Sequence, residues 1–355
     1  MKGRNWVVLI VVACGLLILV KVLFGDKDSK ENLPSEKDDG IVIGFSLSSI
    51  VIDRWQRDRD VFVATAKELG AEVIVQTANE DKETQIKQIE YLMKEGVDVL
   101  VINPDDKDGL SDVVRRAKAQ GIKVIAYDRS ISNADVDVYV SFDNQKLGRL
   151  MGETMLEYVP TGNYVIINGS LKDNNSIMYN VGFHEAIDEA VENKDITIIK
   201  EVWGEDWGEE IAYTSMEEVI QSGEKVDGVI AANDRFAEAA IRVLAENRQA
   251  GDVVVIGHDA ELSACQRIVE GTQKATIYKS ITDMAEGAAR LAIDLANGKE
   301  INFQSTYDDG TYEVPRIMYD VFIVTNDNMV DIIVNKGFHR LEDIYQNVPK
   351  EQWPK

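Results

Sequence analysis

Two hydrophobic patterns alternate along this chain from residue 41 onward. Short apolar runs bounded by Gly, Asp or Asn are followed by segments of about 10 to 16 residues in which apolar positions recur with helical spacing. In the segment 83–94, for example, Ile86, Ile89 and Leu92 recur every third residue among Gln, Lys and Glu. This alternation is typical of parallel sheets covered by helices, so the pattern predicts an α/β fold.

The predicted strands fall into two series, one after the other along the chain. Because each series has the same strand and helix alternation, and because a chain of 355 residues is long enough for two cores, we expect two domains built from one repeated unit. The predicted strands of the first series are 41–47, 72–77, 97–103, 123–127 and 136–141, and those of the second are 164–168, 197–202, 228–232, 253–257 and 275–278.

The amino-terminal pattern is different. Lys2 and Arg4 precede an apolar stretch at 6–24 that only Lys21 interrupts. A helix of this length, rising about 1.5 Å per residue, spans roughly 28 Å, close to the 30 Å core of a bilayer. The pattern therefore predicts an N-terminal transmembrane helix, with the positive flank inside and the rest of the chain outside the cytoplasm.

A lipid anchor at Cys14 is the alternative to an uncleaved helix. The run Val11-Val12-Ala13-Cys14 loosely resembles a lipoprotein cleavage box, but the chain stays apolar after the cysteine, where a lipoprotein normally becomes polar. In either case residues 1–25 are expected to be a membrane anchor or signal. Residues 26–40, rich in charge, are expected to be a linker.

Composition excludes several classes of function. The net charge of -24 argues against nucleic-acid binding, because a protein that neutralises phosphates needs a basic patch. Cys14 and Cys265, the two cysteines of the sequence, form no paired motif that predicts a disulfide or a metal site. Neither a phosphate-binding loop nor a dinucleotide-binding fingerprint is present, so we expect no cofactor.

Polar residues follow most of the predicted strands. In open parallel sheets, ligands bind beyond the carboxyl ends of the strands, which makes these positions the candidates for a site. Each Asp or Asn could instead be an ordinary helix cap, but capping does not require Trp, Arg and Lys at the same edge. The candidate binding residues are Arg54, Trp55, Asp128, Arg129, Asp173, Asn175, Trp207, Asn233, Asp259 and Lys279.

The chemistry of these side chains suits a neutral ligand with many hydroxyl groups. A sugar hydroxyl both donates and accepts, so it can pair with carboxylates, with cationic donors and with the amides of Asn175 and Asn233. An indole offers a flat apolar face to the C–H face of a pyranose ring. Trp55 and Trp207, one from each predicted domain, are therefore expected to cover the two faces of one ring.

At these positions the sequence resembles a known family. It is similar to the xylose-binding branch of the ribose- and galactose-type periplasmic sugar-binding proteins of bacteria, from about residue 41 to residue 339. The matching stretches are Arg54-Trp55-Gln56-Arg57-Asp58-Arg59-Asp60, Ala126-Tyr127-Asp128-Arg129, Ser141-Phe142-Asp143-Asn144, Asp173-Asn174-Asn175, Asn233-Asp234, Asp259-Ala260 and Ile277-Tyr278-Lys279.

The resemblance implies a type I periplasmic binding protein fold, in which two Rossmann-like domains are joined by three crossing strands. It implies crossings near Asp143, Ser280 and Phe303. It also implies that D-xylose or a similar pentose is the ligand and that the ten candidate residues are its contacts. The expected domains are 41–143 plus 281–303 and 144–280 plus 304–340, followed by a tail at 341–355.

Two other classes of function are disfavoured. An enzyme would need a catalytic set, yet His184, His258 and His339 have no partner at a recognisable catalytic spacing. Adjacent residues of a strand point to opposite faces, so His258 and Asp259 are not expected to act together. A sugar-responsive repressor can share this fold, but here an apolar segment stands where its DNA-binding head would be.

Two outputs of sugar binding remain open. A membrane partner could be an ABC permease that imports pentose, or a sensor histidine kinase or chemoreceptor that reports it. A tether that is not cleaved would keep the protein beside its partner and prevent shuttling, which favours xylose sensing over transport.

Overall fold

The computed structural model describes residues 40–51 and 53–354. The anchor expected at 1–25, nearly all of the linker expected at 26–40, and Cys14 lie outside these residues. Among the helices of the described residues, none combines the length and the apolar character needed to cross a membrane.

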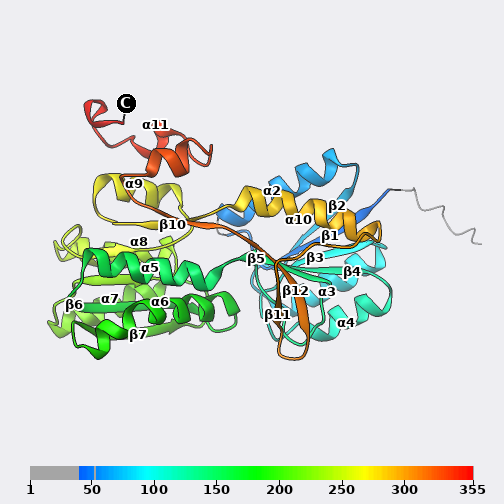
Figure 1. Cartoon of the computed structure of the whole chain (residues 1–355), viewed down its shortest axis with the longest axis horizontal. Helices are drawn as coiled ribbons and strands as arrows, with labels where there is room; N and C mark the ends of the chain where they lie inside the picture. The colour runs from blue at the N-terminus through cyan, green and yellow to red at the C-terminus, as the bar shows by residue number, and fades with distance from the viewer. Residues whose placement is uncertain (1–39, 52, 355) are drawn as a thin grey trace, which may run out of the picture. The chain divides into compact units, whose positions relative to one another are not determined.

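The first sheet has seven strands in the order β11-β12-β5-β4-β3-β1-β2 (Figure 1). All neighbouring strands pair in parallel except the β11–β12 hairpin, which is antiparallel. The strands are β1 (Val42–Leu47), β2 (Glu72–Thr77), β3 (Val99–Asn103), β4 (Lys123–Tyr127), β5 (Val138–Phe142), β11 (Ser305–Asp308) and β12 (Glu313–Tyr319).

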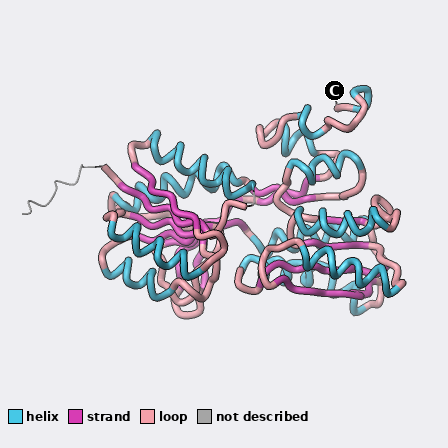
Figure 2. Tube along the Cα trace, turned by 180° about the vertical axis from the view of Figure 1, so that it is seen from behind, coloured by secondary structure: helices cyan, strands magenta, loops and turns pink. Residues whose placement is uncertain are grey.

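Helices cover both faces of this sheet (Figure 2). Every residue of β3 is buried, and its alternate residues belong to two different cores. Val99 and Val101 pack with helices α2 (Asp53–Glu68) and α10 (Ile281–Ala296), whereas Leu100 and Ile102 pack with α3 (Lys82–Lys94) and α4 (Ser111–Ala119). Burial on both faces explains why β3 is apolar throughout, except at Asn103, and does not alternate with polar residues.

The second sheet has four parallel strands in the order β7-β6-β8-β9. A backbone bridge from Ile256 to Ala275 connects it to the antiparallel pair β10–β13. The strands are β6 (Gly162–Ser170), β7 (Ile196–Gly204), β8 (Gly228–Ala231), β9 (Val254–Ile256), β10 (Thr276–Lys279) and β13 (Val321–Val324). We call the β1–β5, β11 and β12 part the first lobe and this part the second lobe.

Helices α5 (Asn144–Tyr158) and α6 (Asn174–Glu192) pack against each other in the second lobe, and so do α7 (Glu210–Ser222) and α8 (Asp234–Glu246). Helix α9 (Leu262–Glu270) contacts the short C-terminal helix α11 (Leu341–Ile344). A π-helical turn at Val330–Val334 and a 3-10 turn at Lys350–Gln352 complete the described helices.

The chain passes between the lobes after β5, after β10 and after β12. The third crossing differs from the expected one near Phe303, because β12 pairs with β5 of the first sheet and β13 pairs with β10 of the second. The crossing therefore lies at Asp320, between these two strands. Residues 305–319, which we expected in the second domain, belong to the first sheet.

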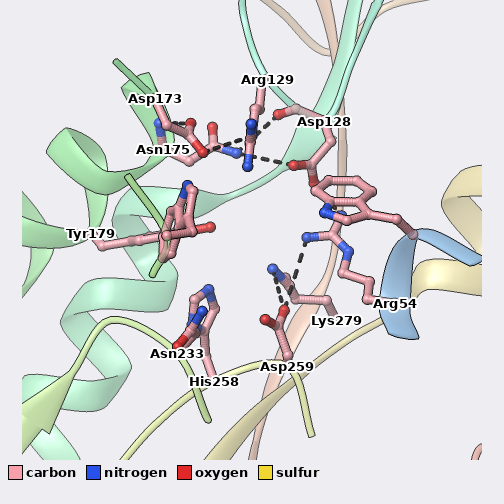
Figure 3. A pocket seen from close by; sticks show the side chains of 12 residues that line it. Arg54, Asp128, Arg129, Asp173, Asn175, Tyr179, Asn233, His258, Asp259 and Lys279 are labelled. Carbon is pink, nitrogen blue, oxygen red and sulfur yellow. Dashed lines mark hydrogen bonds and ion pairs between the residues drawn. The ribbon is translucent and has the colours of Figure 1, made fainter. Parts of the chain in front are cut away.

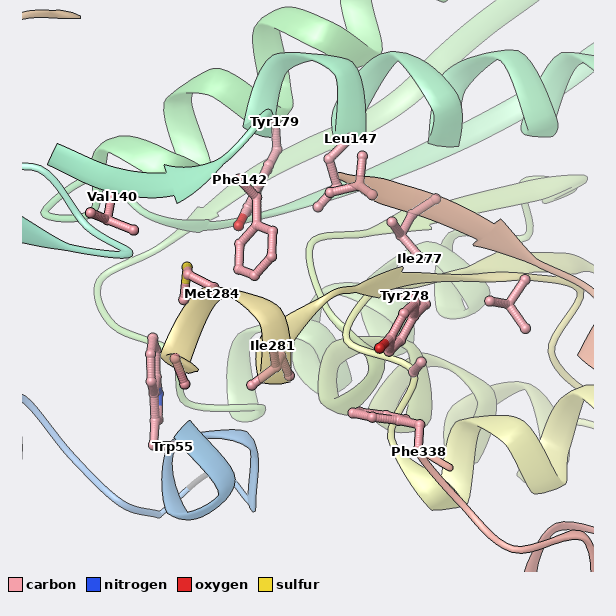
Figure 4. Close-up of a cluster of buried hydrophobic side chains, with 14 of the residues drawn as sticks. Trp55, Val140, Phe142, Leu147, Tyr179, Ile277, Tyr278, Ile281, Met284 and Phe338 are labelled. Atoms are coloured by element: carbon pink, nitrogen blue, oxygen red, sulfur yellow. The ribbon is translucent and has the colours of Figure 1, made fainter. Parts of the chain in front are cut away.

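Apolar side chains pack around these connections. Phe142, Tyr278 and Ile281 stand at or next to the crossings and belong to one continuous core that includes residues of both lobes (Figure 4). Phe338, from the C-terminal segment, packs edge-on against Tyr278, with ring centroids 4.9 Å apart. The C-terminal segment thus takes part in the core between the lobes.

Helices α5 and α6 approach so closely that only glycine fits at their contact. A Cβ atom on Gly182 would overlap the carbonyl oxygen of Gln145, and one on Gly148 would overlap that of Tyr179. Because both obstacles are backbone atoms, a side chain here forces the two helices apart, and the helices of the second lobe cannot keep their packing.

We therefore expect Gly182→Ala to lower the free energy of unfolding by about 1–3 kcal/mol, although alanine favours helix by about 1 kcal/mol. Urea denaturation measures this loss. Val181→Ala, at the neighbouring exposed position of the same helix, is the control and should change stability by about 0.5 kcal/mol or less. Equal stability of the two variants would contradict the close helix contact.

Candidate functional site

A cavity of about 320 Å³ lies between the lobes, where carboxyl ends of strands from both sheets approach one another (Figure 3). All ten residues predicted from the sequence line it, so the structure brings the whole candidate set together. Their role in binding remains a prediction. The lining residues are Arg54, Trp55, Asp128, Arg129, Asp173, Asn175, Tyr179, Trp207, Asn233, His258, Asp259 and Lys279.

The first lobe presents its side chains from the ends of β1 and β4. Arg54 and Trp55 stand in the first turn of α2, and Asp128 directly follows β4. Asp128 has a φ of 63°, in the left-handed region, and backbone contacts hold it there. Its N–H donates to Val140 O at 2.7 Å, and its carbonyl accepts from Ser141 Oγ at 2.6 Å.

The second lobe supplies residues that both cap helices and line the cavity. The Asp173 side chain accepts from the backbone N–H of Asn175 at 2.9 Å, and that of Asn233 accepts from Phe236 N–H at 2.8 Å. The same residue can therefore cap a helix and also line the site. Trp207 comes from the loop between β7 and α7.

Five buried charges lie together at one end of the cavity. Arg54 donates a hydrogen bond to Asp128. Its other guanidinium nitrogens lie 3.5 Å from an Asp58 oxygen and 3.9 Å from an Asp259 oxygen. Lys279 Nζ lies 2.7 Å from Asp259 Oδ1. The cations are thus each matched by carboxylates, as buried charges require.

The pKa shifts in this cluster follow from burial and charge. Burial opposes ionisation of Asp259, but the neighbouring cations, chiefly Lys279, lower its pKa to about 2. Burial raises the pKa of Asp58 to about 6 despite Arg54. Burial, followed by the charge of Arg54, lowers the pKa of Lys279. Asp259 is therefore a fixed acceptor at neutral pH.

One ion pair and two hydrogen bonds join the two lobes beside the cavity. Arg129 Nε of the first lobe lies 2.7 Å from Asp173 Oδ2 of the second. Asn175 Nδ2 donates to the carbonyl oxygen of Asp128 at 3.1 Å and to its carboxylate at 3.2 Å. Asn144 Nδ2 donates to Asn175 Oδ1 at 2.8 Å and fixes the orientation of that amide. The structure therefore represents an arrangement in which the lobes are in contact.

Comparison with known proteins identifies the family. Residues 43–300 match the family described as periplasmic binding protein domain. The chain belongs to the periplasmic binding protein family.

Two curated relatives lie within this family. The chain is 38% identical over 345 residues to the D-xylose-binding periplasmic protein of Escherichia coli K12, which covers 97% of this chain and all of the relative. It is 40% identical over 304 residues to the D-xylose-binding periplasmic protein of Haemophilus influenzae, which covers 85% of this chain and 92% of the relative. This similarity confirms the resemblance noted in the sequence motifs.

A solved structure supports the type I fold of this periplasmic binding protein. An ABC transporter solute-binding protein from Clostridium phytofermentans, solved with bound β-D-glucose, superposes with a TM-score of 0.79 and 26% sequence identity. The match covers 85% of this chain and 99% of that structure. The predicted fold class is therefore confirmed for the described residues, whereas the N-terminal helix that we added to it is not.

Sequence reasoning missed two residues of the cavity, Tyr179 and His258. Tyr179 stands four residues after Asn175 on α6, so helical spacing placed both on one face and could have revealed it. The expectation that His258 and Asp259 face opposite ways was wrong. Strand β9 ends at Ile256, and Asp259 has a φ of 108°, so the alternation of a strand does not extend to these residues.

His258 contributes a neutral ring to the cavity. Burial lowers its pKa to about 3, so the imidazole carries no charge at neutral pH. Its ring packs edge-on against Tyr179, with centroids 4.7 Å apart. The sum of charges that line the cavity is therefore set by the Arg, Lys and Asp side chains alone.

A larger polar cavity of about 840 Å³ adjoins the site. Trp55, Arg129, Asp173 and Trp207 line both cavities and so form the boundary between them. The Arg129–Asp173 ion pair spans this boundary, and separation of the two side chains would open the inner cavity toward the outer one.

Proposed function

We propose that this periplasmic binding protein binds D-xylose or a closely related pentose in the cavity. The observation that carries the proposal is the charge balance of the lining. Arg54, Arg129 and Lys279 are matched by three carboxylates, Asp128, Asp173 and Asp259, so the lining favours an uncharged ligand. At the same time it offers many hydrogen-bond donors and acceptors.

The aromatic content of the cavity fits a single sugar ring. Trp55 and Trp207 come from different lobes and both line the cavity. We propose that their indoles cover the two faces of the pyranose ring while the charged groups bind its hydroxyls.

Closure of the lobes would link binding to a partner. The contacts from Arg129 to Asp173 and from Asn175 to Asp128 join the lobes beside the ligand cavity. A sugar that touches both lobes has a higher affinity for the closed form and shifts the population toward it. A membrane partner that contacts both lobes would then recognise the loaded protein.

We propose import as the principal output, with an ABC permease as the partner. The names of the D-xylose-binding relatives and of the ABC transporter solute-binding protein support this choice over catalysis or nucleic-acid binding. The protein would act outside the cytoplasm. Xylose sensing through a sensor histidine kinase is a second candidate. The apolar segment at 6–24 favours it. This segment would anchor the protein to the cell membrane, either as a single-pass helix or through a lipid on Cys14.

Titration calorimetry of the full-length protein with xylose, ribose, glucose and arabinose tests the ligand. We expect micromolar or tighter binding of xylose and a change in tryptophan fluorescence, since two indoles line the cavity. No heat with any of these sugars would refute the proposed ligand class. Equal affinity for all four would refute a preference for xylose.

Gene deletion separates the two outputs. If the protein serves import, its loss should abolish high-affinity uptake of labelled xylose. Transcription of xylose-induced genes should then respond only to xylose inside the cell. If it serves sensing, its loss should abolish induction while a separately expressed transporter still imports xylose. Fractionation of a Cys14→Ala variant tests the anchor, because only a lipoprotein depends on that thiol.

A further inference from the structure

The dipeptide Phe338-His339, here called the rear clamp, contacts both lobes without lining the cavity. Its first contact is with helix α2, which carries Arg54 and Trp55 into the site. Arg57 Nη1 donates to the carbonyl oxygen of Phe338 at 3.0 Å, and the Arg57 guanidinium lies 4.0 Å from the centroid of the Phe338 ring. Arg57 stands one helical turn after Arg54, so this contact and the cavity share one segment of α2.

The second contact of the rear clamp is with the loop that carries Asp259. His339 Nε2 lies 2.8 Å from the carbonyl oxygen of Ala260. A carbonyl only accepts, so this ring nitrogen bears the proton and donates. The backbone N–H of the same residue, Ala260, donates to Thr276 Oγ1 at 3.1 Å. Both polar groups of Ala260 are thus fixed by side chains.

This fixation matters because the loop has an unfavourable backbone. Asp259 has a φ of 108° and Ala260 a φ of 52°, conformations that residues with a side chain rarely adopt. Such a backbone persists only where the surrounding contacts hold it. Here it directs the Asp259 carboxylate toward Lys279 and the cavity.

The rear clamp itself belongs to the second lobe. The residues that follow it form helix α11, which packs on α9. Gln266 of α9 donates to the carbonyl oxygen of Asp343 at 2.8 Å. The contact with α9 anchors the segment to one lobe, and the contact with Arg57 reaches to the other. The Arg57–Phe338 contact therefore joins the two lobes.

We propose that the rear clamp is an affinity-determining element of the site, in which His339 positions Asp259 and Phe338 holds α2 in the closed form. His339 and Phe338 are positioning residues, because neither lines the cavity. The proposal rests on the proposed sugar binding. Since the clamp contact with Arg57 joins the two lobes in this arrangement, we expect its loss to speed release of sugar more than it slows binding.

The test compares His339→Ala, His339→Gln and Arg57→Met with the unchanged full-length protein. Stopped-flow tryptophan fluorescence gives the association and dissociation rates for xylose. We expect His339→Ala and Arg57→Met each to raise the dissociation rate about fivefold, the effect of one lost hydrogen bond, with an association rate within about twofold of the unchanged protein. Glutamine can donate from a similar distance, so His339→Gln should restore most of the affinity.

His184→Ala is the matched control. His184 lies on α6 and contacts Asp188 and Glu201, away from the cavity. It should leave both rates unchanged. The double variant His339→Ala with Arg57→Met should lose less than the product of the single effects, because both act through one dipeptide.

Each outcome supports or overturns the proposal. Unchanged rates in folded His339→Ala and Arg57→Met, with an intact melting transition, would overturn the rear clamp. So would an equal loss in His339→Gln and His339→Ala, because the donor would then be irrelevant. Absence of xylose binding by the unchanged protein would instead refute the proposed function.

Discussion

Replacing Asp259 with asparagine should weaken xylose binding by about ten- to a hundredfold, which corresponds to about 1.5–3 kcal/mol for a buried charged hydrogen bond. Asp259 is buried and ionised, and it is the carboxylate 2.7 Å from Lys279 Nζ. The amide would remove the acceptor charge and leave Lys279 without its ion-pair partner. Because burial already lowers the pKa of Lys279, this lysine would also become a poorer donor to the sugar.

Titration calorimetry of Asp259→Asn against the unchanged protein measures this effect. Asp60→Asn is a matched control, because Asp60 is exposed on α2 and pairs only with its neighbour Arg59 among the described ion pairs. The control should retain its affinity. An Asp259→Asn variant that binds xylose as tightly as the control would show that this carboxylate does not contact the ligand.

Strands β1 to β10 could be predicted because most of them are short apolar runs. For example, β3 is buried on both faces and reads as a run of Val, Leu and Ile that ends at Asn103. Strands β11, β12 and β13 were missed. Residues of β11 alternate between half-buried and exposed, so no apolar run marks it. The third crossing was misplaced because it depends on the pairing of β12 with β5, which local sequence does not specify.

The site was predictable to the extent that it follows from topology. Residues after parallel strands meet at one edge, which placed Asp128 and Asp259 correctly without knowledge of their contacts. His258 was assigned to the wrong side because the positive φ of Asp259 cannot be inferred from the residue type. The ion pair from Arg129 to Asp173 joins the two lobes, and it depends on how closely they approach. Sequence spacing contains no such information.

Replacing Arg54 with methionine should both abolish xylose binding and lower the free energy of unfolding by about 3–5 kcal/mol, the usual effect of breaking a buried ion pair. Arg54 lies among three buried carboxylates, those of Asp128, Asp58 and Asp259. Without the guanidinium these groups would have to ionise in a buried place with less opposing positive charge. The folded-state pKa values of Asp58 and Asp259 should rise, and that of Asp58 is already raised to about 6 by burial.

The sign of the pH dependence follows from linkage. A carboxyl whose pKa is higher in the folded state than in the unfolded state binds more protons when folded, so the folded state is favoured by acid and loses stability as the pH rises. The stability difference between the unchanged protein and Arg54→Met should therefore be smaller at about pH 5.5 than at about pH 8. Urea denaturation at the two pH values measures this difference.

Arg59→Met, which removes a more exposed arginine from the same helix, should lower the free energy of unfolding only slightly at either pH. A loss for Arg54→Met that is equal at both pH values would mean that the buried carboxylates do not depend on this guanidinium for their charge.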